Sequence, residues 1–348
     1  MEERDYGSAL DQPLTTSFKG GCKMKDSRNF FKVFAFFISF MVVLSFSSPC
    51  YSKELQTLKV GYLPIMDLLQ LYVGWEKGFF EEEGLKVEGQ KAKGGSVIQT
   101  LVESGSVDLG WTAVVPLSQA HPKGFDFIFI APGAFIDRSN RRLCSVVVSK
   151  STPYKTIRDL AGKKIGVNSI HSLNHLSILT IADYYGVDTK GMKFLEVQFP
   201  MQPAAVKEGA VDAASMLEPF VTISESQGFG REIFNGFYPP EVVERYMVAG
   251  WFAKKSAVGK NKDKIGRFIK AINKATDFIN KNPDQLPDIV GNNTRVKAEL
   301  ARKVTLPKFF KNLYKNDIQA QIDLSAKYGF IKKGFDAREI VTDLIPLQ

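Results

Sequence analysis

The feature that most constrains the fold of this chain is a pattern of short strands and helices that occurs twice. Residues 59–62 (KVGY) have a counterpart in residues 164–167 (KIGV), and residues 103–110 (ESGSVDLG) have one in residues 207–214 (KEGAVDAA). Both pairs are separated by about 105 residues. Matched landmarks at one spacing predict two lobes of similar design. Chance similarity between short strands is the alternative, but each landmark recurs at the same place in the pattern.

Apolar, β-rich segments alternate with amphipathic segments in each copy. In the first copy, strands are expected at residues 58–62, 85–87, 107–111 and 125–131. Asp67, Ser96 and Thr112 each stand where they could cap the following helix, and the first two have a glutamine three residues later, as in a capping box. This alternation predicts an α/β fold whose parallel strands are joined by crossover helices.

The order of these elements predicts that the chain passes between the lobes twice. The crossings are expected near Cys144–Val148 and Val248–Trp251. The first lobe would then combine residues 53–145 with residues 248–348, and the second lobe would be residues 146–247. A length of 348 residues is compatible with more than one domain.

The C-terminal third is expected to be helical and to complete the first lobe. Apolar residues recur at helical spacing, and Asn282-Pro283 can end the helix. The stripe consists of Ile265, Phe268, Ile269, Ile272, Ala275 and Ile279. It predicts a helix packed on the protein core rather than on a membrane or a partner.

Residues 1–52 are interpreted as an upstream extension followed by an export signal. Three basic residues after Met24 precede an apolar stretch over residues 33–46, and small residues follow it. The alternative is a single uncleaved anchor helix, but the stretch is short for a membrane span. Residues 1–23 are mixed polar and precede Met24.

Cleavage is expected after Ser52, because Cys50 and Ser52 place small residues at the two positions that signal peptidase recognises. A lipoprotein with Cys50 lipidated is the alternative, and Pro49 argues against it. The protein is therefore expected in the periplasm. After cleavage Cys144 is the only cysteine, so an intramolecular disulfide is excluded.

The composition argues against nucleic-acid binding and against common catalytic machinery. The net charge of +9 is spread along the chain without a long basic run or a basic-aromatic patch. The chain has no HExxH, P-loop, GxSxG or GxGxxG motif. His171 and His175 have i, i+4 spacing but no third ligand nearby, so neither a metal nor a cofactor is expected.

Several short motifs together resemble one family of periplasmic proteins. In chain order they are 61–64 (GYLP), 78–80 (GFF), 83–85 (EGL), 94–96 (GGS), 159–167 (DLAGKKIGV) and 217–220 (LEPF). Their order and spacing are similar to those of the nitrate/sulfonate/taurine/pyrimidine-precursor family of solute-binding proteins. The resemblance covers residues 58–230.

The resemblance implies a two-lobed periplasmic-binding-protein fold of type II, with a ligand cleft between lobes joined by two crossings. It also implies a monomer that catalyses nothing and delivers a small organic solute to the permease and cytoplasmic ATPase of an ABC transporter. Two alternatives stay open. One is an enzyme related to fungal pyrimidine-precursor synthesis, although that enzyme depends on a cysteine-rich motif that this chain lacks. The other is the sensing lobe of a membrane receptor.

Ligands of open parallel sheets bind beyond the carboxyl ends of the strands. These positions define the expected ligand site: Pro64, Met66, Asp67, Gly95, Ser96, Trp111, Thr112, Asn168, Ser169, His171, Glu218 and Pro219. Gly94, Ile170, Leu217 and residues 199–201 occupy the same strand ends.

Two chemistries are suggested at these strand ends. The turn at Gly95–Ser96 and the start of a helix at Thr112 would present free backbone N–H groups, which suit an anion or another acceptor, although both side chains could simply cap their own helices. Glu218 is expected to contact a ligand that carries N–H donors, in the way the resemblance implies, or else to form a structural salt bridge.

Trp111 could stack on a flat ligand or pack in the core. Arg138, Arg141 and Arg142 could face the cleft or the solvent.

The mature protein is predicted to begin near Lys53, because the basic flank, the apolar core and the small residues end at Ser52. Intact-mass analysis of the exported protein checks this. A mass that includes residues 24–52, or a lipid on Cys50, would contradict it.

Overall fold

The computed structural model describes residues 54–294 and 296–348; the predicted signal segment lies outside them. A first five-stranded sheet has the order β2-β1-β3-β12-β4. Its strands are β1 (Gln56–Tyr62), β2 (Leu85–Lys91), β3 (Leu109–Ala113), β4 (Phe127–Pro132) and β12 (Ala249–Lys254). β1 is parallel to β2 and β3, whereas β12 is antiparallel to β3 and β4.

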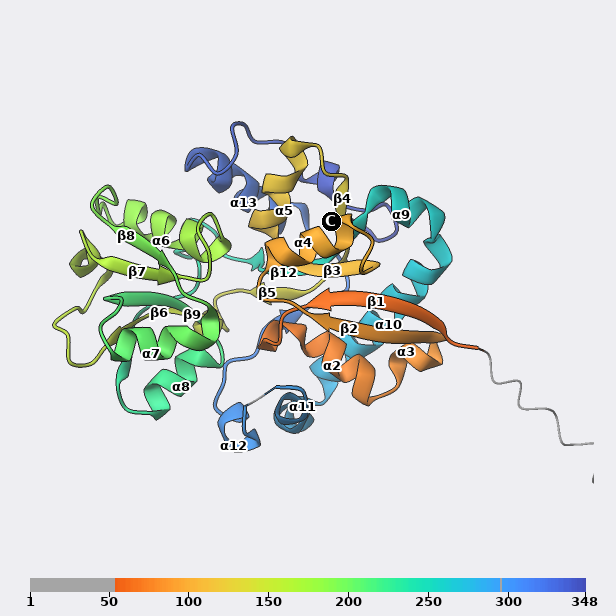
Figure 1. Cartoon of the computed structure of the whole chain (residues 1–348), viewed down its shortest axis with the longest axis horizontal. Coiled ribbons are helices and arrows are strands. Elements are labelled where there is room, and N and C mark those ends of the chain that lie inside the picture. The colour runs from red at the N-terminus through yellow and green to blue at the C-terminus, as the bar shows by residue number, and fades with distance from the viewer. Residues whose placement is uncertain (1–53, 295) are drawn as a thin grey trace, which may run out of the picture. The chain divides into compact units, whose positions relative to one another are not determined.

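A second five-stranded sheet repeats this arrangement. Its order is β10-β6-β9-β7-β8, and Figure 1 shows β6, β7, β8 and β9 as a group separate from β1, β2, β3 and β12. The strands are β6 (Cys144–Ser149), β7 (Lys164–Val167), β8 (Lys193–Glu196), β9 (Ala213–Leu217) and β10 (Gly230–Asn235). β7 is parallel to β8 and β9, and β6 is the antiparallel strand beside β9. The predicted two-lobed α/β architecture is therefore confirmed.

The duplicated sequence landmarks make the same contact in both sheets. In the first sheet, the Lys59 N–H donates to Asp108 Oδ2 over 2.8 Å and the Asp108 N–H donates to the Lys59 carbonyl over 2.9 Å. In the second sheet, the Lys164 N–H donates to Asp212 Oδ2 over 2.9 Å and the Asp212 N–H donates to the Lys164 carbonyl over 2.8 Å. Each aspartate thus fixes the start of one parallel strand against another: β3 against β1 in the first sheet, and β9 against β7 in the second.

A small third sheet lies on the segments that join the two large ones. It consists of β11 (Tyr246–Met247), β5 (Ala134–Ile136) and β13 (Lys308–Phe309), all antiparallel. The crossings were predicted near Cys144–Val148 and Val248–Trp251, but these residues belong almost entirely to β6 and β12. The chain changes sheet just before each of them, and β5 and β11 pair there.

Helices cover the sheets and form most of the C-terminal part. The α-helices are α2 (Leu69–Glu76), α3 (Phe79–Glu82), α4 (Gly95–Glu103), α5 (Val114–Ala120), α6 (Leu173–Tyr184), α7 (Gln202–Lys207), α8 (Phe220–Ser226), α9 (Lys255–Lys260), α10 (Lys262–Lys281), α11 (Leu286–Asn293), α12 (Ala298–Ala301) and α13 (Lys315–Lys327). The 3-10 turns are η1 (Met66–Leu68), η2 (His121–Lys123), η3 (Arg141–Leu143), η4 (Ile157–Leu160), η5 (Phe199–Met201), η6 (Pro283–Gln285) and η7 (Ala337–Ile340). None of the helices in the described ranges is long and apolar enough to span a bilayer.

The long helix α10 carries the predicted apolar stripe. All six stripe residues are buried. Phe268 stacks on Phe80 with ring centroids 5.6 Å apart and meets Trp251 edge-to-face at 5.1 Å. The helix ends at Asn282 as predicted. Its apolar face thus joins the core of the first lobe.

The predicted helix caps are wrong in all three cases. Asp67 lies inside η1, and Ser96 lies in the first turn of α4, whose N-cap is Gly94. Thr112 is an interior residue of β3, opposite Gly250, and α5 starts two residues later. For Thr112, strand pairing extends further than the sequence pattern suggests, whereas Asp67 and Ser96 fail to cap because their helical segments start one residue before them.

Gly133 is predicted to be intolerant of a side chain. It lies between β4 and β5, and an added Cβ would lie 2.5 Å from the Ala249 carbonyl oxygen. Because backbone is less able to yield than a side chain, Gly133→Ala should lower the free energy of unfolding by about 1–3 kcal/mol. Gly266 in α10 has open space, so Gly266→Ala should raise it by about 0.5–1 kcal/mol. Denaturant unfolding measures both, and equal stabilities would contradict the close approach at Gly133.

Candidate functional site

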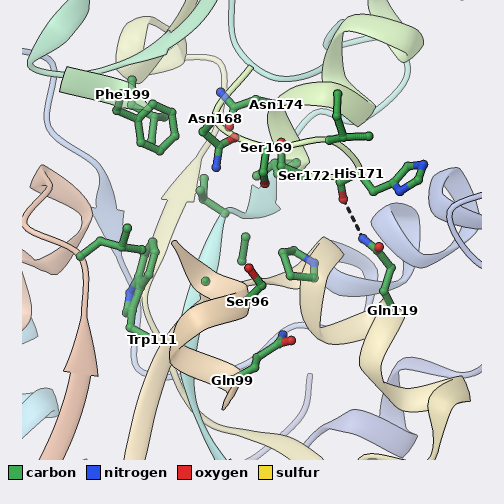
Figure 2. Close-up of a pocket in the computed structure, with 18 of the residues that line it drawn as sticks. Ser96, Gln99, Trp111, Gln119, Asn168, Ser169, His171, Ser172, Asn174 and Phe199 are labelled. Carbon is green, nitrogen blue, oxygen red and sulfur yellow. Dashed lines mark hydrogen bonds between the residues drawn. The ribbon is translucent and has the colours of Figure 1, made fainter. Parts of the chain in front are cut away.

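The strand ends of both large sheets meet at a cavity of about 400 Å³. Its lining includes residues after β1 and β3 of the first sheet and after β7 and β8 of the second, together with Leu217 at the end of β9. Figure 2 shows Ser96, Gln99 and Trp111 on one side, with Asn168, Ser169 and Phe199 across from them. Parallel strands place their carboxyl ends at one edge, so this arrangement follows from the topology.

Seven of the residues expected at the ligand site line the cavity. They are Asp67, Gly95, Ser96, Trp111, Asn168, Ser169 and His171. Of the neighbouring strand-end residues, Ile170, Phe199 and Leu217 line it as well. The first lobe thus contributes a carboxyl group, a hydroxyl group and an indole, and the second lobe contributes an amide, a hydroxyl group and an imidazole.

Five expected residues do not line the cavity: Pro64, Met66, Thr112, Glu218 and Pro219. Leu63 and Ile65 line it instead of Pro64, and Met66 is buried in the apolar core. Thr112 lies between two lining residues of β3, Trp111 and Ala113, because alternate strand residues face opposite sides. The Thr112 side chain packs beneath Gly95, where an added Cβ would lie 2.7 Å from Thr112 Oγ1.

Asp67 is the most unusual group in the cavity. It is 1% exposed, and neither of its carboxyl oxygens has a hydrogen-bond partner among the described residues. Burial raises the pKa of Asp67 from 3.8 to about 7, with no opposing charge or hydrogen bond. The side chain can therefore exist in either protonation state near neutral pH.

Other lining residues also present unpartnered polar atoms. Trp111 Nε1 and Gln99 Nε2 are donors without an acceptor, and Asn168 Oδ1 is an acceptor without a donor, in the part of the chain described. Buried polar groups in proteins are normally paired. A set of unpaired groups around one cavity indicates a place where a bound molecule supplies the partners.

The loop before α6 contacts the first lobe through a hydrogen bond and through the packing of the His171 ring against Phe330. Gln119 Nε2 donates to the His171 carbonyl oxygen over 2.7 Å (Figure 2). His171 has a positive φ of 60°, and its N–H donates to His175 Nδ1 over 3.0 Å. Burial lowers the pKa of His175 to about 4, so this ring is neutral at physiological pH. The two histidines therefore shape the loop.

Glu218, expected to contact the ligand, does not line the cavity and is paired with other groups of the protein. Its side chain is fully buried and its oxygens accept from Arg142 Nη1 at 2.9 Å, Thr222 Oγ1 at 2.8 Å and the Thr305 N–H at 3.2 Å. Arg142 also binds Glu225 and Glu232. The alternative of a structural salt bridge is thus the one observed, and Pro219 only precedes α8.

The basic residues weighed for the cleft are engaged elsewhere. Arg138 pairs with Glu244 over 2.8 Å, and Arg141 donates to the Asn235 carbonyl. Lys123 is the one lysine or arginine that lines the cavity within the described ranges, and it is exposed. The cavity therefore lacks a buried cation for an anionic ligand.

Sequence reasoning missed lining residues that lie one helical turn beyond the strand ends. Gln99 follows Ser96 by three residues on α4, and Asn174 stands in the first turn of α6, so helical spacing could have indicated both. Phe237 and Val248 enter from the crossing segments. No local pattern marks those two, because only the path of the chain brings them to the cavity.

Comparison with known proteins identifies relatives of this chain. The family described as NMT1/THI5 like matches residues 66–286. A putative thiamine biosynthesis protein of Haemophilus influenzae is 25% identical over 253 residues, which cover 72% of this chain and 76% of that protein. The 4-amino-5-hydroxymethyl-2-methylpyrimidine phosphate synthase of Aspergillus parasiticus is 26% identical over 222 residues. That match covers 61% of this chain and 63% of the synthase, less than two thirds of its length.

Among solved structures, the periplasmic aliphatic sulphonate binding protein SsuA from Escherichia coli is similar in fold. The TM-score is 0.68 at 18% identity, covering 82% of this chain and 97% of that chain. This likeness confirms the two-lobed periplasmic-binding-protein fold (type II) that the sequence motifs implied.

The pairing of Glu218 predicts that Glu218→Gln lowers stability and spares ligand binding. Replacing the carboxylate weakens charge-assisted hydrogen bonds in a buried site, which should cost about 1.5–3 kcal/mol. Chemical denaturation gives the stability, and calorimetric titration with any solute that the unaltered protein binds gives the affinity. Normal melting with weakened binding would restore Glu218 as a ligand contact.

Proposed function

Because the chain belongs to the NMT1/THI5-like family, we propose that it is the extracytoplasmic solute-binding component of an ABC importer. It captures a small organic solute between its lobes and delivers it to a membrane permease that a cytoplasmic ATPase drives. The solute is sulfonate- or taurine-like, or aminopyrimidine-like. The names of the relatives support both classes, since one is a sulphonate-binding protein and another is named as a synthase of an aminopyrimidine phosphate.

The observation that carries this proposal is the cavity with its unpartnered polar atoms. Asp67, Gln99 and Trp111 come from the first lobe, and Asn168 comes from the second. Neither set alone encloses a small molecule, so a solute that satisfies both favours the conformation in which the lobes are together. Binding of the solute in the cavity thus changes the conformation of the protein, and a permease can recognise that change.

The proposed lobes are residues 53–145 with 248–348, and residues 146–247. The crossing segments that carry β5 and β11 are the proposed hinge, since they are short and hydrogen-bonded to each other. In this proposal the mature protein acts in the periplasm as a monomer, without nucleic acid or a cofactor.

An enzyme of pyrimidine-precursor synthesis is the alternative that the Aspergillus relative favours. Cys144 is the one cysteine in the described ranges; it is fully buried and lines no part of the cavity. Burial raises the pKa of its thiol, which keeps it unreactive. These facts support a binding role over a cysteine-dependent reaction. A sensing lobe of a membrane receptor would share the same cavity, and neighbouring genes would distinguish the two.

A thermal-shift screen of sulfonates, taurine, nitrate and aminopyrimidines tests the proposed function. A solute at a hundred times its dissociation constant should stabilise the protein by about 2.7 kcal/mol. Small-angle scattering with a saturating hit should give a smaller radius of gyration than the solute-free protein gives. An unchanged radius would contradict hinge closure, and conversion of the solute to a product would favour the enzyme.

A further inference from the structure

Asp67 is a buried carboxyl group for which the fold provides no partner. It belongs to η1, lines the cavity and is 1% exposed, with both oxygens free of hydrogen bonds from the described residues. Removing a carboxylate from water without pairing it is costly, so unpaired buried acids are rare. Its presence in the cavity calls for a partner.

The other buried acidic residues of the described ranges show what a structural role looks like. Glu218 accepts hydrogen bonds from three residues, as described above. Asp317 accepts from Arg245 Nε at 3.1 and 3.0 Å. Both therefore have a cationic partner within the protein. Asp67 differs from both, and because it faces the cavity, its partner can come from a bound solute.

We infer that Asp67 is the specificity-determining residue of the cavity and selects a solute with N–H donors, such as an amidine or an aminopyrimidine, over sulfonates and nitrate. This inference rests on the proposed solute-binding function. Two adjacent N–H groups on a planar solute match the two oxygens of a carboxylate. An anion would instead place like charges together inside a poorly solvated cavity.

The rest of the cavity fits a flat, nitrogen-bearing solute. Trp111 offers an indole face and an unpartnered N–H, Asn168 offers an unpartnered carbonyl oxygen, and Gln99 offers an unpartnered N–H. Apolar walls come from Leu63, Ile65, Phe199 and Leu217. The single lining lysine, Lys123, is exposed and therefore a weak counter-ion.

The ionisable groups near Asp67 leave its charge uncompensated. Tyr72 and Cys144 are close enough for the Asp67 charge to raise their pKa values, and the Tyr72 hydroxyl donates to the Ile65 carbonyl rather than to Asp67. His171, Glu196 and Lys123 are the other ionisable side chains of the cavity. Burial holds the pKa of Asp67 near 7, so its protonation changes within the physiological range.

Both protonation states of Asp67 could bind a solute, and pH distinguishes them. A carboxylate that accepts from an N–H donor loses this role on protonation, so affinity should fall up to tenfold per pH unit below about 7. A carboxylic acid that donates to a sulfonate oxygen would show the opposite trend. The sign of the pH dependence therefore identifies the chemistry.

The experiment titrates the purified protein calorimetrically with benzamidine, 4-aminopyrimidine and ethanesulfonate. Benzamidine remains an amidinium between about pH 6 and 8, so a change in its affinity reports on the protein. Asp67→Asn should weaken the binding of both nitrogen-bearing probes by about 10- to 100-fold without lowering the melting temperature. The matched control Asp277→Asn, in the surface pair with Lys311, should leave affinity unchanged.

We expect the nitrogen-bearing probes to bind more strongly than ethanesulfonate does. Their affinity should fall at low pH in the unaltered protein but not in Asp67→Asn. Preferential binding of ethanesulfonate, or affinity that rises at low pH, would overturn the inference while leaving the proposed function intact. The inference would also be overturned if Asp67→Asn bound benzamidine and 4-aminopyrimidine as tightly as the unaltered protein does. If no probe binds and the broader screen of the proposed function finds no solute, the proposed function fails together with the inference.

Discussion

The architecture depends on one reciprocal contact that each large sheet makes. An aspartate directly before one strand (β3 or β9) accepts the N–H of a lysine on the neighbouring parallel strand (β1 or β7), while its own N–H donates to that lysine's carbonyl. Asp108 and Lys59 make this contact in one sheet, and Asp212 and Lys164 make it in the other. It fixes the register of two parallel strands, and register decides which side chains reach the carboxyl end. Trp111 and Leu217 reach the cavity because their strands start at that aspartate.

Two buried carboxyl groups near the strand ends have opposite roles. Glu218 follows β9 and is held by Arg142, Thr222 and the Thr305 backbone, so it ties the second sheet to the C-terminal segment. Asp67 follows β1 and has no such partner. Of these two acids near the strand ends, one is satisfied by folding and the other is left for a solute. Both are acidic residues that follow a strand, so these two features do not distinguish their roles. The roles differ because hydrogen-bond donors surround Glu218 but not Asp67.

The sequence allowed the two-lobed α/β fold to be predicted because the duplicated landmarks and the apolar periodicity are local signals. Asp67, Trp111 and Asn168 were placed at the site for the same reason, since each ends or follows a recognisable strand. The sequence left a ligand contact and a salt bridge open for Glu218, and its partner could not be predicted, because Arg142 lies 76 residues away and meets it only in the folded chain. Thr112 was misplaced because the end of β3 depends on pairing with β12, which comes from a distant part of the chain.

The position of β12 determines the order in which the protein can assemble. The second large sheet is made entirely of residues 144–235, so its strand pairing needs no residue outside that stretch. The first large sheet begins earlier but stays incomplete until β12, at residues 249–254, arrives to separate β3 from β4. Nascent chains that end before residue 254 therefore hold β3 and β4 with unpaired inner edges. The first large sheet therefore starts earliest in the sequence but is completed last. The cavity forms only when both sheets are complete.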